Sequence, residues 1–138
     1  MSVSVTPQEF KFVAYDAALI QRVAEELLAS LGLTDHDVHV EVDETTPLSR
    51  MRVDAGDTIS IRAESGAFED TKRPRQQSEI ATATSIGRVL LRVRDRMSGG
   101  FGEAPPDEEL TLAQVAAWET YCVGRLQRLG IEVNEQRW

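Results

Sequence analysis

Apolar residues recur with helical spacing in three stretches of the chain. The first follows Asp16, a good N-cap, and ends at Gly32, which is placed to close a helix in a left-handed conformation. The second runs from about 76 to 97, and the third follows Thr111, which is spaced to form a capping box with Gln114. The spacing predicts three amphipathic helices, with apolar positions such as Leu19, Val23, Leu27, Ile80, Ile86, Leu90, Leu112, Cys122 and Leu126.

Strict alternation of apolar and polar residues predicts a strand over 37–43. Its valines share one face, while His39 and Glu41 share the other. Residues 1–15 carry both a helix-start signal and a strand-like alternation, and the pattern leaves their structure open.

A second alternating stretch predicts a hairpin made by residues 51–53 and 58–61. If Met51 lies opposite Ile59, both face the same side, and Asp54-Ala55-Gly56 forms a three-residue turn. Gly56 is then expected to adopt the left-handed conformation that such a turn needs.

The remaining stretches lack periodicity. Residues 63–77 predict a long surface loop, and the glycines and prolines of residues 98–110 predict a flexible connector. A chain of 138 residues fits one domain, so we expect residues 1–138 to fold together. The order of the elements predicts an α+β fold, with three main helices packed on a small antiparallel sheet.

Composition places the chain among globular proteins. It is 41% hydrophobic and 28% charged and has no apolar run that could span a bilayer, so we expect no membrane partner. Residues 1–5 lack the features of a secretory signal, which predicts a cytoplasmic protein. The single cysteine, Cys122, lies on an apolar helical face and is expected to be a buried, unreactive thiol.

Charge is distributed unevenly along the chain. The net charge is −8, which disfavours nucleic acid, but residues 71–97 hold seven basic groups against two acidic ones. Basic side chains lie on the predicted loop (Lys72, Arg73 and Arg75) and at helical spacing on the following helix (Arg88, Arg92 and Arg96). We interpret these six residues as a candidate surface for an acidic protein or a small anionic ligand, with a solvated helix face as the simpler interpretation.

His36 and His39 are the only histidines, and they are weak metal-ligand candidates. Their three-residue spacing at the start of a strand differs from the i, i+4 helical pair that aims two imidazoles at one ion. A solvated strand edge is the simpler interpretation of this pair, and no cofactor is predicted.

The segment Ser78-Glu79-Ile80-Ala81-Thr82 opens the second helix where small zincin-like metallopeptidase domains carry an H-E-x-x-H motif. The order helix, strands, helix over about 80 residues also resembles that family. Ser78 and Thr82 stand at both ligand positions, and hydroxyls do not hold catalytic zinc. The resemblance implies a metallopeptidase-like fold without the activity. Glu79 is its only candidate for a general base, and the simpler role for Glu79 is a first-turn carboxylate that favours the helix dipole.

These features predict a non-catalytic interaction or binding module. The alternatives are a metal-dependent hydrolase that uses His36, His39 and nearby carboxylates, and a module that binds an anionic ligand or nucleic acid through its arginines. The sequence names neither the partner nor the oligomeric state, and self-association stays open.

Overall fold

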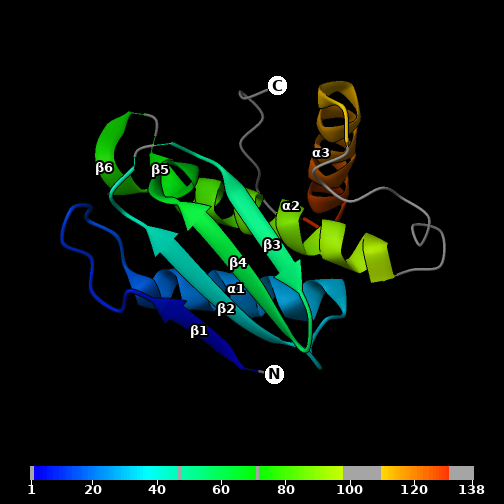
Figure 1. The fold of residues 1–138 in the computed structure, drawn as a ribbon, viewed down its shortest axis with the longest axis horizontal. Coiled ribbons are helices and arrows are strands. Elements are labelled where there is room, and N and C mark those ends of the chain that lie inside the picture. The colour runs from blue at the N-terminus through cyan, green and yellow to red at the C-terminus, as the bar shows by residue number, and fades with distance from the viewer. Residues whose placement is uncertain (1, 47, 71, 98–109, 131–138) are drawn as a thin grey trace.

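The fold has one four-stranded sheet with helices on one of its faces (Figure 1). The structure, a computed structural model, describes residues 2–46, 48–70, 72–97 and 110–130. Its main elements in chain order are β1 (Val3–Thr6), α1 (Ala17–Leu31), β2 (Asp37–Asp43), β3 (Met51–Ala55), β4 (Thr58–Glu64), α2 (Glu79–Met97) and α3 (Leu112–Arg128). Helices α1 and α2 pack against the sheet and each other, and α3 packs on α2. The predicted α+β class is confirmed.

The sheet is mixed, so the predicted all-antiparallel arrangement is wrong. Its strand order is β1-β2-β4-β3, and β1 and β4 both run parallel to β2. Only β3 is antiparallel, through its hairpin with β4. The crossover helix α1 returns the chain to the same end of the sheet and makes β1 and β2 parallel. After β2 the chain goes first to the edge strand β3, and the hairpin then places β4 between β3 and β2, parallel to β2.

The predicted hairpin forms in a different register. Met51 pairs with Ala63, and Ala55 pairs with Ile59, so the strands are longer and the turn is shorter than predicted. Gly56 is not among the described glycines with positive φ, which are Gly32 and Gly130. Met51 and Ile59 nevertheless face the same side of the sheet, as predicted, because the two registers differ by an even number of residues.

Local signals at the helix ends are confirmed. The Asp16 side chain accepts a hydrogen bond from the Ala18 N–H at 2.9 Å, and Gly32 ends α1 with a φ of 72°. Thr111 and Gln114 form the predicted capping box at the start of α3. Residues 1–15, which the pattern left open, contribute β1 at an edge of the sheet.

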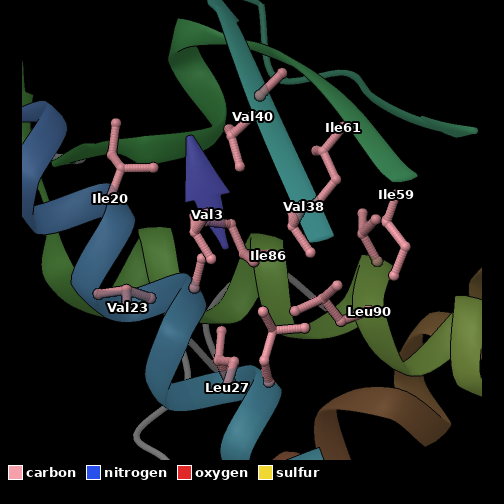
Figure 2. Close-up of a cluster of buried hydrophobic side chains, with 14 of the residues drawn as sticks. Val3, Ile20, Val23, Leu27, Val38, Val40, Ile59, Ile61, Ile86 and Leu90 are labelled. Carbon is pink, nitrogen blue, oxygen red and sulfur yellow. The ribbon is translucent and has the colours of Figure 1, made fainter. Parts of the chain in front are cut away.

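The hydrophobic core lies between the sheet and its two helices (Figure 2). Figure 2 shows valines and isoleucines of the strands opposite the apolar side chains of α1 and α2. Fully or almost fully buried members include Val38, Val40, Ile59, Ile61, Ile20, Leu28, Ile86 and Leu90. Burial of apolar side chains on this one face is the main stabilising contribution to the sheet.

The stretch 63–77 differs from the predicted surface loop. It contains the end of β4, a buried 3₁₀ turn η1 (Ser65–Phe68), and a small hairpin of β5 (Glu69–Asp70) and β6 (Arg73–Gln77). Phe68 is fully buried, and the Ser85 hydroxyl of α2 donates to the Ala67 carbonyl at 2.8 Å. The predicted connector 98–110 lies outside the described residues, apart from Leu110.

Helix α3 approaches α2 closely at Gly87. A Cβ atom added there would lie 2.9 Å from both Cδ atoms of Leu126, which is fully buried. Gly87 therefore sets the distance between the two helices, and its cost in helix propensity is offset by this packing.

We expect Gly87→Val to lower the free energy of unfolding by about 1–3 kcal/mol, because the added methyl groups force Leu126 and α3 outward. Chemical denaturation measures the change. The matched control is Gly124→Ala in α3, where an added Cβ meets nothing within 4 Å and the gain in helix propensity should raise stability by up to about 1 kcal/mol. Equal effects of the two substitutions would contradict the close approach.

Candidate functional site

The outer face of the sheet, opposite the helices, is polar and exposed. The strand registers align its side chains in two rows, which are Thr6, Glu41, Arg62 and Arg52 in one and Ser4, His39, Ser60 and Asp54 in the other. All of them are exposed except the half-buried His39. No described helix or strand covers this face, so it is accessible as far as β3 at its edge.

The backbone of β3 presents hydrogen-bonding groups on the side away from β4, here called the free edge. The Glu64 N–H donates to the Arg50 carbonyl at 2.9 Å, and the Gly56 N–H donates to the Thr58 carbonyl at 3.3 Å. Hydrogen-bonded pairs alternate along an antiparallel ladder, so even-numbered residues of β3 turn their backbone groups toward β4. The N–H and C=O of Met51 and Val53 therefore point outward, where no strand of the described ranges pairs with them.

A hollow of about 770 Å³ extends over β2, β4 and β3 and includes residues of all three strands and of α2. Its β3 lining consists of the half-buried Met51 and Val53 and the outer-face residues Arg52 and Asp54, and α2 contributes Arg92. The rest of the lining comes from β2 and β4: His39, Glu41, Ser60, Ile61 and Arg62. The free edge is thus flanked by apolar side chains on the helix side and by charged side chains on the outer face. This combination suits an extended polypeptide, whose side chains also alternate between two faces.

Arg52 is the one arginine of β3, and it lies directly opposite Arg62 of β4. Arg62 has a counter-ion, since its Nε lies 3.5 Å from Glu41 Oε2. Within the described parts of the chain, the Arg52 side chain makes no ion pair or hydrogen bond. Like charges directly opposite each other weaken a sheet slightly, so Arg52 gains from any carboxylate brought to the free edge.

The two histidines are not brought together into a metal site. His39 lies on the outer face with both ring nitrogens 2.7 Å from hydroxyl oxygens, Nδ1 from Ser4 and Nε2 from Thr6. His36 lies in the turn before β2, where its backbone N–H donates to Leu33. Among the residues that the structure describes, no three His, Cys, Asp or Glu side chains are grouped to hold a metal ion.

Glu79 lies in the first turn of α2 and forms an ion pair with α1. Its Oε1 is 2.7 Å from Arg22 Nη2, and both side chains are more than half exposed. Thr82, at the second ligand-equivalent position, is fully buried and donates to the Ser78 carbonyl at 2.8 Å. The Ser78 hydroxyl oxygen accepts from the Ala81 N–H, so it acts as a local helix cap.

The predicted arginine stripe lies on α2 but faces α3. Arg88 is mostly buried and lies 3.6 Å from Glu119, while the guanidinium carbons of Arg92 and Arg96 lie 4.9 and 5.1 Å from the ring centroid of Trp118. These contacts hold α3 on α2. Of the three, Arg92 also lines the hollow along β3.

The basic residues before α2 lie apart from this stripe. Lys72 and Arg73 are exposed on the β5–β6 hairpin, and Arg75 belongs to β6. Figure 1 shows this hairpin at one end of the molecule and the second half of α2, with α3, at the other. The structure thus divides the six predicted residues into two groups.

A buried carboxylate, Asp95, anchors α3. Its two oxygens accept hydrogen bonds from both Nη atoms of Arg125 at 2.7 Å, and Oδ2 also accepts from Trp118 Nε1 at 2.8 Å. Burial raises the pKa of Asp95, but the hydrogen bonds from Arg125 and Trp118 outweigh burial and leave the pKa below its usual value of 3.8. Cys122 is buried as predicted, and burial raises the pKa of its thiol to about 11.

No protein-family model, no curated protein and no solved structure matches the chain. In the described residues, no helix combines the length and the apolar character needed to cross a membrane. The interpretation of the site therefore rests on its own geometry and chemistry.

We expect Asp95→Asn to lower the free energy of unfolding at pH 7 by about 3 kcal/mol, because it leaves the Arg125 guanidinium without its charged partner in a mostly buried setting. The stabilisation by ionised Asp95 is complete above the unfolded-state pKa and is lost as the pH falls through the lower folded-state pKa. Urea unfolding should therefore show a constant difference between wild type and variant from pH 7 to pH 5, and a shrinking one below about pH 4.

The matched control is Glu119→Gln, which removes the longer and more exposed ion pair with Arg88. We expect it to change stability by less than about 1 kcal/mol. A similar loss in both variants would contradict the central role of Asp95.

Proposed function

We propose that the domain is a non-catalytic binding module that receives an extended segment of a partner chain at the free edge of β3. The observation that carries the proposal is the outward orientation of the Met51 and Val53 backbone groups beside a hollow of about 770 Å³. Strand addition at an open sheet edge is a common mode of peptide recognition, in which backbone hydrogen bonds supply affinity and alternate side chains supply specificity.

The alternation of β3 supports this mode of binding. Met51 and Val53 continue the apolar inner face of the sheet, and Arg52 and Asp54 continue its polar outer face. An added strand would extend both faces by one position without any rearrangement of the core. Strand β3 pairs with β4 and packs against α2, so its edge is already ordered before a partner binds. This preorganisation limits the entropic cost of binding.

The non-catalytic part of the proposal is supported by the contacts of the candidate catalytic groups. Glu79 is paired with Arg22, and the ring nitrogens of His39 lie within hydrogen-bonding distance of Ser4 and Thr6. We also propose that the domain is a zincin-like one that lacks the zinc ligands, on the strength of the helix–sheet–helix order and of Ser78 and Thr82 at the ligand-equivalent positions. A cytoplasmic location remains our expectation.

A display library of random 12-residue peptides tests the binding proposal. Selected peptides should shift the backbone amide resonances of β3 and β4 and leave those of α1 unchanged. Val53→Pro should weaken their binding by about tenfold or more, because proline removes the outward N–H and obstructs the edge. The same N–H takes no part in the β3–β4 ladder, so the variant should stay folded.

The matched control for this experiment is Val53→Thr, which keeps the backbone N–H and a similar side-chain size and should bind within a fewfold of wild type. Peptides that shift a different surface, or that bind equally well to Val53→Pro, would contradict the proposal.

Metal analysis tests the non-catalytic part separately. We expect purified protein to carry far less than one equivalent of any transition metal, and its melting temperature to be the same with chelator and with added zinc. Near-stoichiometric metal that is lost in His39→Ala would instead favour the metal-dependent hydrolase.

A further inference from the structure

The free edge of β3 is complementary to itself. A strand that pairs antiparallel with residues 51–55 is best matched by an acidic residue opposite Arg52, an apolar residue opposite Val53 and a basic residue opposite Asp54. Because that strand runs in the opposite direction, its own order from N- to C-terminus is basic, apolar, acidic. The segment Arg52-Val53-Asp54 has this order.

Two-fold pairing about Val53 also satisfies the backbone. Val53 of each copy would lie opposite Val53 of the other, and the outward N–H and C=O of both residues would form a hydrogen-bonded pair. Residue 51 of each copy would lie opposite residue 55 of the other, and the half-buried Met51 continues the apolar inner face of the sheet. Such an interface is isologous, as expected of a two-fold dimer.

The outer face supplies charge complementarity twice. Arg52 of each copy would lie opposite Asp54 of the other, which gives Arg52 the carboxylate that the described residues do not provide. The row that runs from Thr6 through Glu41 and Arg62 to Arg52 would then continue into the second sheet. Opposite charges at directly facing positions stabilise strand pairs, and like charges destabilise them.

We propose that the partner chain at β3 is a second copy of this protein, and that the two four-stranded sheets join through antiparallel pairing of β3 about Val53. This inference rests on the proposed function, because it names the occupant of the same edge. The strand has only five residues, and each copy has a net charge of −8, so the dimer should be weak and depend on concentration.

Sedimentation equilibrium of the full chain, from about 10 µM to about 1 mM, tests the dimer across the range expected of a small interface. Arg52→Asp places two aspartates opposite each other at both ends of the pairing and should weaken dimerisation by about tenfold. Asp54→Arg should do the same with two arginines. The swapped variant that carries both substitutions restores opposite charges and should dimerise like wild type.

An equimolar mixture of Arg52→Asp and Asp54→Arg provides the sharpest test. Each variant alone should be mainly monomeric, whereas the mixture should form heterodimers, because both facing pairs are then oppositely charged. The matched control is Arg128→Asp, which makes the same charge change at an exposed position on α3 and should leave dimerisation unchanged. Thermal unfolding of each variant checks that it is folded.

A chain that is monomeric at the highest concentration overturns this inference, as does a dimer unaffected by Arg52→Asp or one that the charge swap does not rescue. A different result contradicts the binding proposal, namely selected peptides that bind Val53→Pro as well as they bind wild type. A monomeric protein whose β3 still binds selected peptides would reject the second copy as the partner and leave the peptide-binding edge standing.

Discussion

The burial of α2 on several sides is the constraint on which the rest of the structure depends. This helix contacts α1, the sheet, η1 and α3, so side chains around most of its circumference are buried. Three buried polar side chains of α2 are hydrogen-bonded within the protein: Thr82 donates to the Ser78 carbonyl, Ser85 donates to the Ala67 carbonyl, and Asp95 accepts from α3. Unsatisfied, each of these buried groups would cost about 1–3 kcal/mol. The small residues that precede the arginines on α2 serve this packing rather than a ligand.

A helix layer on only one face leaves the sheet asymmetric, and this asymmetry creates the interaction surface. Valines and isoleucines of β2 and β4 fill the inner face, while charged and hydroxyl side chains occupy the outer one. In the described residues both edges of the sheet are unpaired, but they differ. At β1, Ser4 and Thr6 contact His39 of the neighbouring strand, whereas at β3 Arg52 has no such contact. An edge with outward hydrogen-bonding groups and an uncompensated charge is the part of this fold best suited to another chain.

Local chemistry could be predicted from the sequence, and non-local pairing could not. Asp16, Gly32 and Thr111 mark helix ends because each acts on backbone groups within a few residues. The register of the hairpin depends on which residues meet across the sheet, and alternation alone fixes only the parity. The parallel pairing of β2 and β4 leaves no local signal, because it arises from connections of the whole chain. The same limit explains 63–77, where burial of Phe68 under α2 organises a stretch without periodicity.

The candidate site shows the same division between local and non-local information. Helical spacing correctly places Arg88, Arg92 and Arg96 on one face, but spacing cannot say what covers that face, and Trp118 and Glu119 come from a helix more than twenty residues later. Conversely, no sequence pattern marks Arg52 and Asp54 as site residues, because charged residues on either side of a valine are what the alternation of an ordinary strand gives. Their significance depends on β3 being an edge and on its odd-numbered residues carrying the outward backbone groups. With those two facts, the order basic, apolar, acidic makes the edge complementary to itself. A strand of the same order that runs in the opposite direction places an opposite charge across from Arg52 and Asp54 and an apolar residue across from Val53.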